Sequence, residues 1–208
     1  MFTREELRQI VEICAGHKIL VVSDEIHCDL ILHEHKKHLP TGLVAEQLQQ
    51  HVLTLMSPSK TYNIAGANCS FAVIPDASIR QRFIDQCMFT VPIVPTLSYT
   101  AAEAAYQYGW PWHQQLIEHL RGNLQLLKQE ISKTPHLWMD DTEATYLAWI
   151  NTSDLPIDNA YEFFLNAGVG LSPGAQFGDG NYQRLNFACS RQQLQEGINR
   201  IQRAIANL

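Results

Sequence analysis

A lysine in a turn rich in hydroxyl groups is the residue of this chain best suited to covalent chemistry. Lys60 lies within Ser57-Pro58-Ser59-Lys60-Thr61, directly after an apolar run at residues 52–56. A neutral lysine amine forms a Schiff base with a carbonyl group, and desolvation or nearby positive charge favours the neutral amine. A lone loop lysine is more often a solvated surface residue, so this interpretation depends on the residues that accompany it.

An aspartate and two serines extend the pattern around this lysine. Asp24 follows a second apolar run, residues 19–22, and the carboxyl ends of neighbouring parallel strands form the usual ligand edge of an α/β sheet. A buried carboxylate there can pair with a protonated ring nitrogen, and the hydroxyls of Ser57 and Ser59 can bind a phosphate. The alternatives are a capping or surface role for Asp24 and turn hydrogen bonds for the serines. An amine, a carboxylate and hydroxyls together suggest pyridoxal 5'-phosphate (PLP) as the cofactor.

An arginine near the C-terminus supplies a group for a substrate carboxylate. Arg191 follows a predicted strand at residues 184–188 and precedes a predicted helix. A guanidinium binds a carboxylate through two parallel hydrogen bonds. A surface arginine is the alternative, although a cation is electrostatically unfavourable at the start of a helix. We therefore predict that Arg191 binds the substrate α-carboxylate.

The elements that position these residues can be predicted from apolar periodicity. Thr3 and Glu6 form a capping box before an apolar stripe, so a helix is expected from there to Gly16. Strand–helix alternation comes first and a smaller α+β pattern follows Pro135, and the domain boundary is expected within the long helix before it, near residue 115. Strands are predicted at residues 18–23, 52–56, 69–74, 144–150, 169–171 and 184–188, and further helices at 78–88, 98–109, 112–133, 159–167 and 192–208. This order predicts an α/β fold with a mainly parallel large domain at residues 1–115 and a small α+β domain at 116–208.

Composition excludes several classes of protein. Among the 208 residues, 46% are hydrophobic and 17% are charged, which is a globular balance, and the net charge of −6 argues against nucleic acid or anionic membranes as partners. No apolar run approaches the roughly 20 residues of a membrane span, and the N-terminus lacks the apolar core of a signal peptide. The five scattered cysteines predict free thiols in a reducing cytoplasm. His33, His35 and His38 could bind a metal, but a solvated surface is the expected reading.

Five ordered segments carry a family resemblance. They are SDEIH at 23–27, SPSKTYNIAG at 57–66, ATYLAWI at 144–150, LSPGAQFG at 171–178 and RLNFACSR at 184–191. Together they resemble the fold-type I PLP enzymes of the class I/II aminotransferase family, and within it the cystathionine β-lyase-like (carbon–sulfur lyase) branch. The resemblance covers nearly the whole chain and implies the large-domain and small-domain fold of that family.

The resemblance implies a role for each residue of the first cluster. Lys60 would bind the cofactor covalently and shuttle a proton, Asp24 would pair with the ring nitrogen, and Ser57 would hold the phosphate. His27 stands where many aminotransferases have a tyrosine beside the cofactor's 3'-oxygen, and this histidine is typical of the lyase-like branch. Many family members also carry a phosphate-binding arginine beyond the lysine, but residues 65–68 contain none.

The same resemblance assigns Arg191 to the substrate carboxylate and brings Tyr146 and Tyr62 near the pocket, where core packing is the commoner role for a tyrosine. It implies β-elimination from a sulfur-containing amino acid, with release of a thiol, pyruvate and ammonia. Two alternatives stay open: transamination with the same cofactor, and a non-catalytic remnant or regulatory PLP-fold module.

Family members are about twice as long as this chain, which resembles their C-terminal half. Related enzymes are homodimers with active sites near the subunit interface, so a homodimer is expected. A missing N-terminal half is a second expected partner, because the absent strands and helices would leave sheet edges and apolar faces bare.

Overall fold

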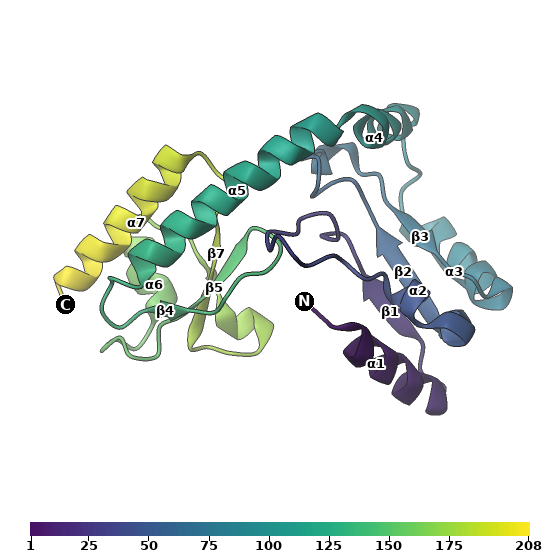
Figure 1. Ribbon diagram of the computed structural model, residues 1–208, viewed down its shortest axis with the longest axis horizontal. Coiled ribbons are helices and arrows are strands. Elements are labelled where there is room, and N and C mark those ends of the chain that lie inside the picture. The colour runs from purple at the N-terminus through teal and green to yellow at the C-terminus, as the bar shows by residue number, and fades with distance from the viewer. The chain divides into compact units, whose positions relative to one another are not determined.

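The structure, a computed structural model, describes all 208 residues and divides into two compact units, Met1–Gln114 and Gln115–Leu208 (Figure 1). The division falls between residues 114 and 115, next to the boundary expected within the long helix. It lies within the longest helix, α5 (Trp110–Ile131). No helix of the structure combines the length and the apolar character needed to cross a membrane.

The first unit is built on a three-stranded sheet of order β1-β2-β3. Its strands are β1 (Val21–Asp24), β2 (Val52–Met56) and β3 (Phe71–Val73). β1 runs parallel to β2 with Asp24 opposite Leu55, and β3 is antiparallel to β2. The helices are α1 (Arg4–Gly16), α2 (Thr41–Val44), α3 (Ala77–Thr90) and α4 (Thr96–Tyr108), with 3-10 turns η1 (Glu46–His51) and η2 (Ala65–Ala67).

The predicted capping box starts α1. The Glu6 backbone N–H donates to the Thr3 hydroxyl at 3.3 Å, and the Thr3 N–H donates to the Glu6 carboxylate at 2.7 Å. Val11 of the buried stripe packs with Ala45 and Val52, so α1 and the segment around η1 cover one face of the sheet. The pattern of residues 41–51 did not predict α2 or η1, because α2 has only four residues and no side-chain cap.

The second unit contains a four-stranded antiparallel sheet of order β4-β5-β7-β6. Its elements are α5, β4 (Trp138–Met139), β5 (Leu147–Asn151), α6 (Ala160–Asn166), β6 (Ser172–Pro173), the 3-10 turn η3 (Gly174–Phe177), β7 (Tyr182–Asn186) and α7 (Arg191–Ala206). The strand predicted at 169–171 begins later, at Ser172. The reason is that the Val169 N–H donates to Phe164 and Gly168 has φ +80°, which together close α6 first.

The core of the second unit lies between its sheet and the two long helices. Ala148, Ile150 and Leu185 are buried on one face of the sheet. Leucine and isoleucine side chains buried at helical spacing complete this core: Leu120, Leu124, Leu127 and Ile131 from α5, and Leu194, Ile198, Ile201 and Ile205 from α7. Because side chains alternate along a strand, those of Tyr182, Arg184 and Asn186 point toward the opposite face of the sheet.

Gly174 provides a test of the LSPGAQFG segment. A Cβ at this position would lie 2.2 Å from the Asp179 carbonyl oxygen and 2.4 Å from that of Tyr182, both backbone atoms. We expect Gly174→Ala to lower the free energy of unfolding by about 1–3 kcal/mol, the usual cost of overpacking. Gly180→Ala is the matched control, because nothing lies within 4 Å of its added Cβ. Urea unfolding of both variants checks the expectation, and equal midpoints would contradict it.

Candidate functional site

The carboxyl ends of the two parallel strands bring four of the predicted site residues to one edge of the first sheet. Asp24 is the last residue of β1, and His27 lies in the turn that follows. Ser57 and Lys60 lie in the turn after β2, which ends at Met56 beside β1. This edge is where α/β sheets bind ligands.

The hydroxyls of Ser57 and Ser59 stabilise the start of the turn that carries Lys60. Ser57 is buried, and its hydroxyl donates to the Cys69 carbonyl oxygen at 2.7 Å. The hydroxyls of Ser57 and Ser59 lie 2.7 Å apart, and the Ser59 N–H donates to Ser57 at 3.1 Å. The turn is therefore tied to the segment that leads into β3. Ser59 is the more accessible of the two hydroxyls.

A hollow of about 540 Å³ opens beside these serines. Its polar wall is formed by Ser57, Ser59, Asn68 and Ser70, and its apolar wall by Ile26 and residues 91–95. Lys60 is half-buried and is not one of the residues that line this hollow. Hydroxyl and amide donors beside an apolar wall match the needs of a group that carries both an oxyanion and a ring.

The residues that follow Lys60 are anchored from two sides. The buried Thr61 hydroxyl donates to the Asp29 carboxylate at 3.0 Å. The Tyr62 ring packs edge-on against Tyr106, with centroids 5.8 Å apart. A Cβ at Gly109 would come within 2.6 Å of the Tyr62 ring, so only glycine permits this approach. Lys60 is thus carried on a turn whose flanks are fixed.

The sequence predicts a buried carboxylate at Asp24, and this prediction is wrong for the chain as it stands. Asp24 is exposed and shares a sheet face with exposed Val22. Its carboxylate accepts a hydrogen bond from the Ile26 N–H at 3.2 Å. At the end of β1, the Asp24 carboxylate is therefore accessible to a ligand.

The buried carboxylate is instead the neighbouring residue, Glu25, which is 4% exposed. It accepts hydrogen bonds from His38 Nε2 at 2.7 Å, the Thr41 N–H at 2.9 Å and the Ser23 hydroxyl at 3.0 Å. Burial raises the pKa of Glu25, but the hydrogen bonds from His38, Thr41 and Ser23 outweigh it and hold the pKa below its usual value. His38 therefore connects the loop before α2 to Glu25.

No three histidine, cysteine, aspartate or glutamate side chains are placed to hold a metal ion.

Glu25→Gln is expected to lower the free energy of unfolding by about 1–3 kcal/mol at pH 7, because buried partners lose a charged acceptor. A carboxylate whose folded-state pKa is depressed stabilises the fold above its unfolded pKa of about 4.3 and loses this effect as the pH falls through the folded value. The difference between variant and wild type should therefore shrink below pH 4.3. Urea titrations at pH 7 and at acid pH measure it, with the exposed Glu12→Gln as control. A difference independent of pH would argue against this role.

Neither Cys28 nor Cys189 is an activated nucleophile. Burial raises the pKa of the Cys28 thiol to about 12, helped by the Asp29 carboxylate. Burial also raises the pKa of Cys189. Both thiols therefore stay protonated near pH 7, and all five cysteines are free.

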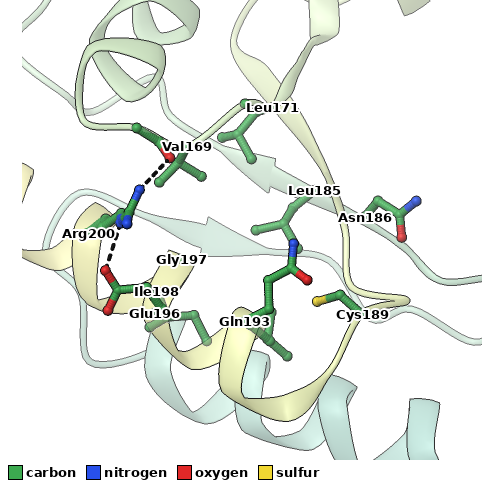
Figure 2. Close-up of a pocket in the computed structure, with 13 residues that line it drawn as sticks. Val169, Leu171, Leu185, Asn186, Cys189, Gln193, Glu196, Gly197, Ile198 and Arg200 are labelled. Atoms are coloured by element: carbon green, nitrogen blue, oxygen red, sulfur yellow. Dashed lines mark hydrogen bonds and ion pairs between the residues drawn. The ribbon is translucent and has the colours of Figure 1, made fainter.

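A second hollow, of about 400 Å³, lies in the second unit, between the backbone of residues 168–171 and the first turns of α7 (Figure 2). Its charged members are committed to each other, because Arg200 donates to Glu196 at 2.7 Å and to the Gly168 carbonyl oxygen at 3.2 Å. Cys189 also lines it. With its charges paired and its thiol protonated, this hollow offers no group for acid–base catalysis.

Arg191 makes structural contacts at the start of α7. Its Nε donates to the Asn123 carboxamide oxygen at 3.1 Å, and its guanidinium lies against Gly122 of α5. Asn123 is fully buried and donates to the carbonyl oxygens of Phe187 and Cys189, both at 2.9 Å. Arg191 is therefore tied to α5, although part of its side chain stays exposed.

A second arginine, which was not predicted from the sequence, lies on the face of the second unit's sheet that points away from the core. Arg184 of β7 is half-buried, with its Cζ 4.4 Å from the centroid of the Phe177 ring. One guanidinium nitrogen donates to the Ser172 hydroxyl at 3.3 Å, and no carboxylate of the chain pairs with it. Arg184 is the first residue of RLNFACSR, so the alternation of that strand was the signal that could have identified it.

Tyr146 precedes β5 and is half-buried. Its carbonyl oxygen accepts a hydrogen bond from the Phe187 N–H at 2.9 Å, and burial raises the pKa of its hydroxyl. Tyr146, Arg184 and Arg191 belong to the second unit, whereas Lys60 and Asp24 belong to the first.

Known proteins match this chain over nearly its whole length. The family model for aminotransferase class I and II matches residues 1–201. Cystathionine β-lyase PatB of Bacillus subtilis (strain 168) is 35% identical over 212 residues, which cover 99% of this chain and 54% of the relative. Protein MalY of Escherichia coli (strain K12) is 32% identical over 208 residues, 95% of this chain and 52% of the relative. The chain thus spans about half the length of these curated relatives.

Solved structures agree with this match. The crystal structure of OvoB has a TM-score of 0.96 and 40% sequence identity, covering 100% of this chain and 55% of that protein. The PLP-bound C-S lyase from Staphylococcus hominis has a TM-score of 0.90 and 30% identity, covering 98% of this chain and 53% of that protein. These matches confirm the predicted fold class and the resemblance to a C-terminal half. The chain belongs to the aminotransferase class I and II family.

Proposed function

We propose that this chain is the C-terminal half of a PLP-dependent carbon–sulfur β-lyase that acts on a sulfur-containing amino acid and releases a thiol, pyruvate and ammonia. The observation that carries the proposal is the placement of an anchored lysine, two serine hydroxyls and an accessible aspartate at the carboxyl ends of parallel strands. Relatives named as cystathionine β-lyase and C-S lyase support this reaction over others.

The residues at this edge fit the proposed cofactor. When bound, PLP supplies an electrophilic carbonyl carbon and a ring that accepts negative charge. Lys60 would hold that carbon through its amine, and Ser57 and Ser59 would hold the phosphate, with Ser59 the more accessible donor. Asp24 would pair with the ring nitrogen, and its exposure leaves the carboxylate open for this contact. His27 would lie beside the 3'-oxygen.

The chain's own groups account for the proton and carboxylate steps. Once the substrate's own amine has displaced Lys60 from the carbonyl carbon, the freed lysine amine would take the substrate's α-proton as a general base. Loss of that proton allows the substrate's carbon–sulfur bond to break, with the electron pair leaving on sulfur. Hydrolysis of the remaining fragment then gives pyruvate and ammonia. An arginine of the second unit would orient the substrate by its carboxylate.

Two arginines are candidates for that carboxylate. Arg191 was predicted from sequence, but its Nε is engaged with Asn123. Arg184 also donates one hydrogen bond, a longer one from a terminal nitrogen to the Ser172 hydroxyl at 3.3 Å, and its guanidinium lies over the Phe177 ring, so its Nε–H stays available for a paired contact. We favour Arg184 and keep Arg191 as the alternative. Tyr146 would contribute to the wall of the substrate site.

Borohydride trapping tests this proposal. The purified chain is mixed with PLP and reduced, and the modified residue is mapped by mass spectrometry. We expect close to one label per chain at Lys60 in the reduced sample, and release of pyruvate from cystathionine or cysteine by a portion that has not been reduced. Absence of label, or label spread over many lysines, would reject a formed site in this chain and favour a non-catalytic module.

Transamination is the second candidate function, because aspartate aminotransferases are also among the relatives, as in Geobacillus stearothermophilus at 25% identity. The product distinguishes the two reactions. Pyruvate formed without an added amino acceptor supports the lyase, whereas a requirement for an acceptor supports transamination. A small amino acid as substrate, a homodimer and a cytoplasmic location remain part of this proposal.

A further inference from the structure

The LSPGAQFG segment places an aromatic ring against the guanidinium of Arg184. The ring is that of Phe177, the last residue of η3, and it is 49% exposed. The Arg184 Cζ lies 4.4 Å from the centroid of this ring, which is within the range of a cation–π contact. Both residues belong to the second unit. The segment thus presents an aromatic face to a cation on the side of the sheet that points away from the core.

The backbone of this segment fixes the place of Phe177. η3 ends at Gly178, whose φ of +99° is a left-handed conformation that glycine adopts without strain. At the other end of η3, the Gly174 carbonyl oxygen accepts a hydrogen bond from the Asp179 N–H at 3.2 Å. These features close a compact turn around Phe177, which limits where its ring can lie.

Aromatic side chains of the sheet support the ring from the side. The Trp149 ring meets Phe177 edge-on, with centroids 5.8 Å apart and planes at 82°. Trp149 is itself stacked on Tyr182, with centroids 5.1 Å apart and planes at 12°. In the pairing of β5 with β7, Trp149 lies directly opposite Arg184. Stacked and edge-to-face pairs are favoured arrangements of aromatic rings, so Phe177 belongs to an ordered aromatic cluster beside the arginine.

An arginine that binds a carboxylate gains from being ordered before the ligand arrives. A flexible arginine side chain loses rotamer freedom when it is fixed, and a contact that fixes it in advance reduces this loss on binding. Arg184 has two such contacts, the Phe177 ring and the Ser172 hydroxyl, which lies 3.3 Å from one terminal nitrogen. The ring contact uses the face of the guanidinium, so it orders the group without occupying its N–H donors.

We propose that Phe177 is a positioning residue, whose ring orients the Arg184 guanidinium for the carboxylate of the substrate. The inference rests on the proposed function, since that function gives Arg184 its ligand. Because Phe177 acts through Arg184, it should influence substrate binding and not the chemical step. Loss of one cation–π contact at an exposed site corresponds to a change of about 2–5-fold in binding.

Two substitutions of Phe177 test this role in steady-state kinetics. Phe177→Leu removes the aromatic face and keeps an apolar side chain, whereas Phe177→Tyr keeps the face. We expect Phe177→Leu to raise the KM for the amino-acid substrate about 2–5-fold with kcat unchanged, and Phe177→Tyr to retain the wild-type KM. In the Arg184→Gln background, Phe177→Leu should have no further effect on KM. Phe163→Leu is the matched control, because Phe163 of α6 is half-buried in the same unit and its ring packs against Phe164.

Side-chain NMR tests the same contact without PLP and without turnover. In the ¹⁵N-labelled chain, the Arg184 Nε–H signal is identified by its absence from Arg184→Gln. We expect the order parameter of this bond to lie above about 0.6 in the wild type and in Phe177→Tyr, and to fall below about 0.6 in Phe177→Leu. Phe163→Leu should leave it unchanged, and circular dichroism of each variant confirms folding.

Three results would overturn the positioning role: an unchanged order parameter in Phe177→Leu, an unchanged KM in that variant, or a rise in KM that is equally large in the Arg184→Gln background. A rise in KM for Phe177→Tyr as large as that for Phe177→Leu would also contradict it. Failure of the proposed function gives a different result. Lys60 then stays unlabelled and no pyruvate is released, while the order parameter still decides whether Phe177 orients Arg184.

Discussion

Lys60→Ala is expected to abolish covalent capture of PLP and to reduce pyruvate release by about 10²–10⁴-fold, the range for removal of a general base. Its amine is the only group of the anchored turn that can both bind a carbonyl carbon and transfer a proton. The two flanking anchors, at Thr61 and Tyr62, do not depend on the lysine side chain, so the fold should persist.

The measurement compares the borohydride label and pyruvate formation of Lys60→Ala with those of Lys37→Ala. Lys37 is an exposed lysine of the loop before α2 and serves as the matched control. Lys37→Ala should retain both readouts. If Lys60→Ala still carries a single stoichiometric label, the assignment of the lysine is wrong, and mapping that label identifies its replacement.

Arg184→Gln is expected to raise the KM for the amino-acid substrate by about 10–100-fold, which corresponds to the loss of about 1.5–3 kcal/mol from charged hydrogen bonds. Arg191→Gln is expected to act on stability instead. It removes the bond to Asn123 and should lower the free energy of unfolding by about 1 kcal/mol with KM changed less than 3-fold.

Steady-state kinetics and urea unfolding of both variants separate the two roles. The comparison is internally matched, because each variant removes one guanidinium from the same unit and leaves a side chain of similar length. Arg184→Lys adds a check, since a lysine keeps the charge but cannot pair with a carboxylate through two parallel bonds. An increase in KM that is confined to Arg191→Gln would instead support Arg191 as the residue that binds the substrate carboxylate, as predicted from the sequence.

Local sequence chemistry predicted most elements of this fold. The capping box at Thr3 and Glu6 starts α1, and the apolar run at 52–56 is β2 itself. These features depend on residues within a few positions of one another, so sequence is sufficient to read them. The same applies to the order of elements, which predicted an α/β unit followed by a small α+β unit. The strand directions needed the structure: the first sheet has one parallel and one antiparallel pairing, and the second is antiparallel.

Tertiary contacts decided what local patterns could not. Asp24 and Glu25 are adjacent acids, yet Asp24 is exposed and Glu25 is buried. Their side chains point to opposite sides of the chain, and Glu25 binds His38 and Thr41, which are 13 and 16 residues away in the sequence. The choice between Arg184 and Arg191 likewise depends on Asn123, more than sixty residues away.

The sequence by itself indicated the family, the candidate cofactor and the candidate lysine, since these rest on residue types in a fixed order. Only the tertiary structure decided which carboxylate is accessible and which partner each arginine side chain contacts. The physical reason is that burial and hydrogen-bond partnership depend on long-range packing, which residue order alone does not specify.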